Sequence, residues 1–104
     1  MLTELNADSF KDTVSNASTP LVVDFWAPWC GPCKALGPVL EEVAEELSDK
    51  AQICKVNIDD CRDLAVELGI QSIPTLYFFK DGEKKDSHVG LISKGELVSK
   101  VESI

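Results

Sequence analysis

The sequence has little of what a site for nucleic acid or a metal ion requires. Its single histidine is His88, and no run of basic residues is longer than the pair Lys84-Lys85. One histidine offers no cluster of imidazole metal ligands. Eighteen acidic against ten basic side chains, a formal net charge of −8, leave no basic surface that could follow a phosphate backbone. We therefore expect no metal and no nucleic-acid partner.

Long apolar runs and a basic start are also missing. The longest apolar stretches, residues 21–27 and 76–79, have the length of strands, whereas a membrane span needs about 20 residues. The first twelve residues are acidic and polar, where an export signal has basic residues followed by an apolar run. We expect no membrane partner and a cytoplasmic location.

The chain has 104 residues, of which 44% are apolar and spread along its length. This size and composition predict one globular domain over residues 1–104, with an adequate core, and we expect it to be a monomer. Its four cysteines could suggest a secreted disulfide scaffold. A competent core without an export signal instead favours a reducing compartment, where thiols are catalytic, metal-binding or simply buried.

Strand and helix patterns alternate along the chain. Strands are predicted at residues 3–5, 21–27, 53–58, 75–80 and 85–89, and helices at residues 8–16, 33–47 and 61–68 and from residue 93 to the end. Gly69 should close the third helix, and Asp81-Gly82 should form a two-residue hairpin turn. Ser93 and Glu96 form a capping-box pattern. The order βαβαβαββα predicts an α/β fold with a central mixed β-sheet flanked by helices.

Cys30 and Cys33 are three residues apart, so on a helix they lie one turn apart on the same side and their sulfurs can bond. The strand ending near Ala27 delivers Cys30 to the start of the long helix, where free N–H groups and the helix dipole stabilise a thiolate. Cys30 is therefore the predicted nucleophile, and Cys33 the cysteine that resolves the mixed disulfide.

Gly31 and Pro32 separate the two cysteines and carry no charge. Gly31 keeps the approach to Cys30 open, and Pro32 suits a helix start because its missing N–H would be unpaired there anyway. A basic residue between the cysteines would make the disulfide more oxidising, so Gly-Pro favours a reductase over an oxidant or isomerase.

Two other interpretations of the cysteine pair compete with redox chemistry. Half of a zinc site is one, but a second pair of ligands is missing, and Cys54 and Cys61 have the wrong spacing. An inert structural pair is the other, and a bare Cys-x-x-Cys leaves it open.

Residues 23–34, Val-Asp-Phe-Trp-Ala-Pro-Trp-Cys-Gly-Pro-Cys-Lys, resemble the active-site signature of the thioredoxin family. The likeness continues at residues 55–59, 69–70, 73–76, 79–82 and 89–90, across essentially the whole chain. It implies a thioredoxin fold and a thiol–disulfide oxidoreductase that reduces disulfides in diverse proteins. It also implies no bound cofactor besides the redox-active Cys30–Cys33 disulfide, and a separate thioredoxin reductase as electron donor.

The resemblance assigns roles to residues around the cysteines. Asp24 matches a buried aspartate that helps remove the proton of the second cysteine, and Lys55 matches a lysine that moderates the charge of that aspartate. Independently, a carboxylate inside an apolar strand should be desolvated and have a raised pKa, suited to accepting a proton.

The resemblance also implies a substrate-binding rim. Pro74 matches a proline whose peptide bond is cis and which faces the disulfide. Ile73 and Pro74, with Trp29 and the region of Gly90, would form an apolar rim that binds a partner segment as an added strand.

Two positions depart from the family pattern. Cys61 adds a thiol where a helix begins, so it could be partly exposed and reactive, with regulation by this thiol as an alternative, whereas Cys54 should be an inert core residue. Leu91 replaces a small residue and could reshape the rim.

A non-catalytic interaction module with the same fold is the alternative function. The intact Cys30, Cys33, Asp24 and Pro74 argue against it.

Overall fold

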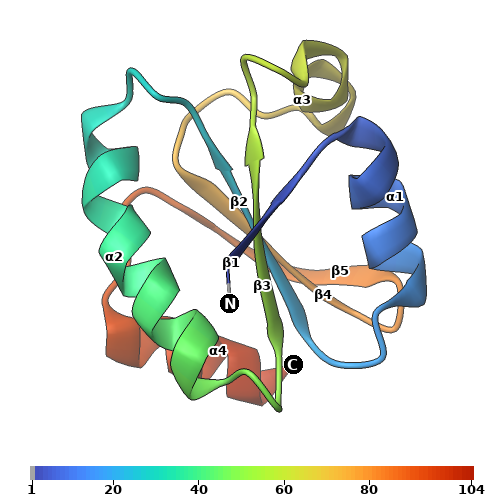
Figure 1. Cartoon of the computed structure of the whole chain (residues 1–104), viewed down its shortest axis with the longest axis vertical. Coiled ribbons are helices and arrows are strands. Elements are labelled where there is room, and N and C mark those ends of the chain that lie inside the picture. Colours follow the sequence, from blue (N-terminus) through green and yellow to red (C-terminus); the bar gives the residue numbers. More distant parts are fainter. Residues whose placement is uncertain (1) are drawn as a thin grey trace.

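The computed structural model describes residues 2–104, which form five strands and four helices around one mixed sheet (Figure 1). The strands are β1 (Leu2–Leu5), β2 (Leu21–Trp26), β3 (Gln52–Asn57), β4 (Thr75–Lys80) and β5 (Glu83–Val89). The helices are α1 (Ala7–Asn16), α2 (Gly31–Glu46), α3 (Arg62–Leu68) and α4 (Lys94–Ser103). The predicted order βαβαβαββα is confirmed.

The strands are arranged in the order β1-β3-β2-β4-β5. β1, β3 and β2 run parallel, whereas β4 is antiparallel to β2, and β5 is antiparallel to β4. Strand β2 is central and buried on both faces, which explains why its sequence is apolar almost throughout. Its carboxyl end leads directly to the cysteine pair.

Helices α2 and α4 cover one face of the sheet, and α1 and α3 cover the other (Figure 1). Side chains of β2 alternate between the two faces, so that Val22 packs under α2 and Val23 packs under α1. By the same alternation Asp24 lies on the α2 face, beneath the start of that helix.

Helix α2 begins at Gly31, two residues earlier than predicted, because Cys30 itself acts as the N-cap. Its Sγ accepts a hydrogen bond from the backbone N–H of Cys33, so a sulfur does what Ser or Asp does at other helix starts. Apolar periodicity begins only at Cys33 and could not reveal this earlier start.

Local signals elsewhere match the structure closely. Asp81 and Gly82 have φ values of 55° and 80°, as a tight hairpin turn requires, and Gly69 ends α3 with φ 73°. Ser93 caps α4 by accepting from the N–H of Glu96.

Candidate functional site

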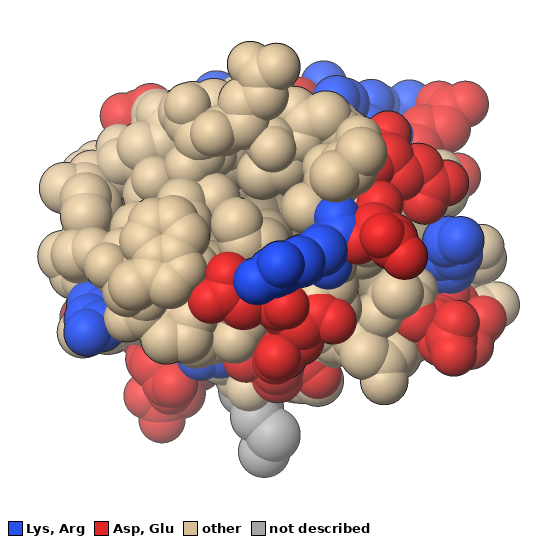
Figure 2. All heavy atoms as spheres, turned by 90° about the horizontal axis from the view of Figure 1, so that it is seen from above, with Lys and Arg blue, Asp and Glu red and all other residues tan. Residues whose placement is uncertain are grey.

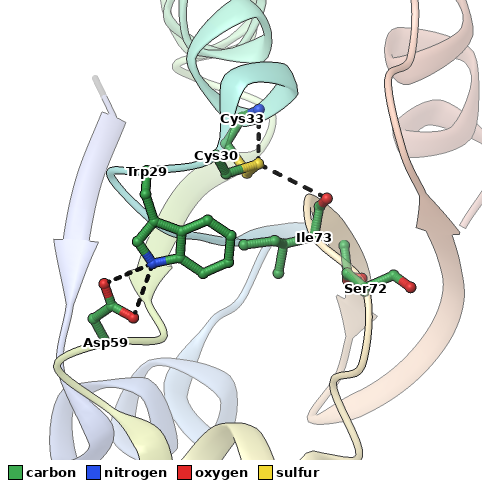
Figure 3. Close-up of a disulfide and its surroundings, with 7 residues drawn as sticks. Trp29, Cys30, Cys33, Asp59, Ser72 and Ile73 are labelled. Carbon is green, nitrogen blue, oxygen red and sulfur yellow. Dashed lines mark hydrogen bonds between the residues drawn. A yellow bond between two sulfur atoms is a disulfide. The ribbon is translucent and has the colours of Figure 1, made fainter.

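Cys30 and Cys33 form a disulfide at the amino end of α2, with their Cα atoms 5.3 Å apart (Figure 3). The N–H of Cys33 points at the Cys30 Sγ from 3.2 Å. This N–H and the positive end of the helix would stabilise negative charge on that sulfur once the disulfide is reduced. A Cβ at Gly31 would meet nothing within 4 Å, so this side of the site is open.

The Ile73–Pro74 peptide bond is cis, as the resemblance implied, and it lies against the disulfide. The carbonyl oxygen of Ile73 lies 3.8 Å from the Cys30 Sγ (Figure 3). The Pro74 side chain is buried, and its carbonyl accepts a hydrogen bond from the N–H of Gly90 at 2.8 Å. The predicted rim residues Ile73, Pro74 and Gly90 are therefore together beside the cysteines.

Trp29 is exposed to 68%, which fits a residue of the expected apolar rim. Its indole Nε1 donates to the carboxylate of Asp59, with 3.0 Å to Oδ2 and 3.3 Å to Oδ1 (Figure 3). Asp59 follows β3, thirty residues away in the sequence. Its contact with Trp29 was not predicted, although Asp59 belongs to one of the family-like segments.

Uncharged residues dominate the end of the molecule where α2 starts. Figure 2 views this end and shows a broad area without Lys, Arg, Asp or Glu, bordered by charged side chains. Three large apolar residues are exposed near the disulfide in sequence or in space: Trp29, Val89 at 61% and Leu91 at 57%. Val89 and Leu91 flank Gly90, so exposed apolar surface adjoins the backbone that holds Pro74.

Asp24 is only 2% exposed. Burial raises the pKa of its carboxyl from 3.8 to about 7, Lys55 opposes this shift, and Glu4 adds to it. Oδ1 of Asp24 is buried without a hydrogen-bond partner among residues 2–104. Asp24 and Cys33 line the same cavity of about 250 Å³, large enough for water. A buried carboxyl group therefore lines the same cavity as Cys33.

Lys55 is the β3 residue that pairs with Asp24 of β2 in the sheet register. Its Nζ lies 3.8 Å from Oε1 of Glu4 on β1, and 4.5 Å from the centre of the Trp26 ring. Sequence reasoning missed Glu4, because nothing local links it to residues 24 and 55. Only the pairing of β1 with β3 reveals it.

The remaining two cysteines are free thiols in the core. Cys54 is buried as predicted, and burial raises its pKa to about 11. Partial exposure of Cys61 was wrong, because its side chain is only 7% exposed and packs with Leu5, Phe10 and Leu64. Burial raises the pKa of Cys61 also. Neither thiol takes part in the site.

A family model described as thioredoxin matches residues 1–103. The chain belongs to the thioredoxin family. The match covers the cysteine pair, the cis proline and the whole sheet, so the resemblance seen in the sequence and the fold agree. Within the family, the Trp29-Cys30-Gly31-Pro32-Cys33 segment corresponds to the redox motif.

Several curated thioredoxins are similar along most of the chain. A protein named "Thioredoxin M-type, chloroplastic" from Pisum sativum is 46% identical over 98 residues, which cover 94% of this chain and 57% of the pea protein. A "Thioredoxin" from Rickettsia prowazekii is also 46% identical, covering 94% and 93%. "Thioredoxin 1" from Synechococcus elongatus is 46% identical over 94 residues, covering 90% and 88%.

The chain thus spans little more than half of the pea relative but nearly all of the bacterial ones. Family membership and the Cys30–Cys33 disulfide together support a thiol–disulfide oxidoreductase. Residues 2–104 bring together no group of His, Cys, Asp and Glu side chains that could hold a metal ion. None of the helices described is long and apolar enough to cross a membrane.

Proposed function

We propose that this protein reduces disulfide bonds in other proteins by reversible oxidation of its Cys30/Cys33 dithiol. The Cys30 thiolate attacks one sulfur of a substrate disulfide, forms a mixed disulfide and releases one substrate thiol. The Cys33 thiolate then attacks the Cys30 Sγ, forms the Cys30–Cys33 disulfide and releases the second substrate thiol. Two electrons and two protons pass to the substrate.

The observation that carries the proposal is the Cys30–Cys33 disulfide at the amino end of α2, beside the cis Ile73–Pro74 peptide. The N–H of Cys33 supports Cys30 as the attacking thiolate, since it already points at that sulfur. Both cysteines are buried, but only Cys33 lines the cavity that Asp24 also lines. We assign Asp24 the role of accepting the Cys33 proton, through water in that cavity, because burial makes it a base near neutral pH.

The substrate is proposed to lie in extended form along Ile73 and Pro74. Trp29, Val89 and Leu91 supply exposed apolar contacts at this rim, and the backbone of Ile73, before the cis peptide bond, would pair with the substrate main chain. Hydrogen bonds to the main chain depend little on the side chains of the substrate, so substrates of diverse sequence can bind. Gly31 and Pro32 keep the approach open and uncharged, and Lys55 moderates Asp24.

For recycling we propose a separate thioredoxin reductase, and we propose that the domain acts as a monomer, without a bound cofactor, in the cytoplasm. A reducing compartment suits the two buried free thiols. The curated relatives come from bacteria and from chloroplasts. Fractionation of the source cells, with antibody to the chain, tests the compartment.

Reduction of a model protein disulfide, with dithiothreitol as electron source, tests the function. The unaltered protein should accelerate the reaction, and Cys30→Ser should abolish the acceleration. Cys33→Ser should instead accumulate a mixed disulfide with the substrate, visible by mass spectrometry. The matched control replaces Cys54 and Cys61 by Ala and should keep full activity. Activity that survives in Cys30→Ser would overturn the proposal.

A further inference from the structure

Glu4, Lys55 and Asp24 form one row across three neighbouring strands. Lys55 of β3 pairs with Glu4 of β1 on one side and with Asp24 of β2 on the other. Residues in register on adjacent parallel strands point to the same face of the sheet. A single lysine therefore stands between two carboxylates, one of them half exposed and the other buried.

Lys55 lies toward the exposed carboxylate. Its Nζ is 3.8 Å from Glu4 Oε1 and 4.5 Å above the Trp26 ring. Among residues 2–104, no cation lies within ion-pair distance, 4.0 Å, of Asp24, and Oδ1 of Asp24 has no hydrogen-bond partner. The lysine thus neutralises the accessible acid and leaves the buried one unpaired.

Glu4 is itself held firmly in this position. Its Oε2 accepts hydrogen bonds from the Trp26 indole Nε1 at 3.3 Å and from the backbone N–H of Asn57 at 3.1 Å. With Oε1 on the Lys55 side, both oxygens of one carboxylate are engaged. A surface glutamate with three partners from two other strands is more ordered than an isolated surface ion pair.

We propose that Glu4 is a positioning residue: it holds Lys55 away from Asp24 and so keeps Asp24 a base strong enough to take the Cys33 proton. This inference rests on the proposed function only in one respect, namely that Asp24 takes the Cys33 proton during disulfide reduction. The row itself, and its effect on Asp24, are properties of the folded protein.

The charges that face Asp24 support this assignment. Lys55 lowers the Asp24 pKa and Glu4 raises it, while burial is the largest cause of its elevation. Helix α2 contributes Cys33 and Lys34 to the cavity that Asp24 lines. From β4, Leu76 is the neighbour in register, and α4 presents apolar Leu97 and Val101 to this face. Glu4 and Lys55 therefore oppose each other in setting the Asp24 charge.

Titration of the Asp24 side-chain carbon by NMR tests the proposal directly. The oxidised protein is used, because its two active-site thiols cannot titrate and no enzymatic activity is required. Glu4→Gln keeps the size and an acceptor oxygen for Trp26 and Asn57 but removes the charge. This substitution should lower the pH midpoint of the Asp24 titration by about 0.3 pH unit or more, which is the size of effect expected from a partly exposed charge pair. Lys55→Gln should raise it.

Three further variants separate charge from structure. Glu4→Asp keeps the charge and should leave the midpoint nearer that of the unaltered protein than Glu4→Gln does. Glu102→Gln removes an exposed charge at the end of α4 and should leave the Asp24 midpoint unchanged. In a Lys55→Gln background, Glu4→Gln should shift the midpoint less than in the unaltered protein, because the lysine that it positions is gone.

An unchanged or raised midpoint in Glu4→Gln would overturn the proposal, as would equal shifts with and without Lys55. If Glu4→Gln does not fold, the same two comparisons are made with Glu4→Ala, which also removes the charge, and the same outcomes apply. Failure of the protein to reduce disulfides would contradict the proposed function and would leave these titrations standing.

Discussion

The backbone N–H of Gly90 donates a 2.8 Å hydrogen bond to the carbonyl of Pro74. This bond joins the segment after β5 to the cis peptide that faces the disulfide. Gly90 has φ 96°, a backbone conformation that favours glycine. Two parts of the proposed substrate rim, distant in sequence, are thus held together through one residue whose backbone tolerates few replacements.

Gly90→Ala should lower the free energy of unfolding by about 1 kcal/mol or more, because a side chain is strained at this φ. It should also weaken binding of protein substrates, seen as a higher KM. Gly95→Ala is the matched control, since Gly95 lies in α4 and a Cβ there meets nothing within 4 Å. Urea denaturation of both variants measures the difference, and equal stabilities would contradict this explanation of Gly90.

Asp24→Asn should stabilise the oxidised protein above neutral pH. The Asp24 pKa is about 7 in the folded protein, against 3.8 for an ordinary aspartate. Between these values the folded state binds more protons than the unfolded state, so the contribution of Asp24 to stability falls as the pH rises and then levels off above 7.

Urea denaturation at pH 5 and pH 8 tests this sign. The free energy of unfolding of the variant should be about 2 to 4 kcal/mol higher than that of the unaltered protein at pH 8, and the difference should be smaller at pH 5. A constant difference at both values would mean that Asp24 has an ordinary pKa. The same variant should slow release of substrate from the mixed disulfide near neutral pH.

Cys54 and Cys61 should be unreactive in the folded, oxidised protein. Both are buried and burial raises both pKa values, so little thiolate is present or accessible at pH 8. A thiol reagent such as Ellman's should detect no thiol under native conditions and two per chain in guanidinium. Rapid native reaction at Cys61 would revive the idea of an exposed regulatory thiol.

Trp29→Ala should reduce kcat/KM for a protein disulfide roughly fivefold or more, because a large exposed aromatic is a typical anchor residue at a binding surface. Activity on a small disulfide such as oxidised glutathione should change much less. Val66→Ala is the control, since Val66 is 79% exposed but lies on α3, outside the rim. Equal losses of kcat/KM in the two variants would show that Trp29 is not part of the binding surface.

Local signals made much of the fold predictable. The bounds of β4, the Asp81-Gly82 turn and the Gly69 cap follow from residues within one or two positions of the feature itself. The cysteine pair and Asp24 were predictable for a similar reason, since the motif and the apolar strand that contains Asp24 are contiguous in sequence. The cis isomer of Pro74 came from the family resemblance alone.

Contacts between distant segments account for the rest. Burial of Cys61 depends on Phe10 and Leu5 packing against it, and Glu4 reaches Lys55 only because β1 pairs with β3. Asp59 meets Trp29 across thirty residues of chain. Periodicity within a segment carries no information about which other segment lies beside it, so these relationships needed the three-dimensional structure.

The most direct measurement is the redox equilibrium of Cys30 and Cys33 in graded glutathione buffers, with Cys54 and Cys61 replaced by Ala. A protein-disulfide reductase should be half reduced at a potential well below that of the glutathione couple. A potential near or above that of glutathione would instead indicate an oxidant or isomerase. Absence of a reversible disulfide would contradict the redox function altogether.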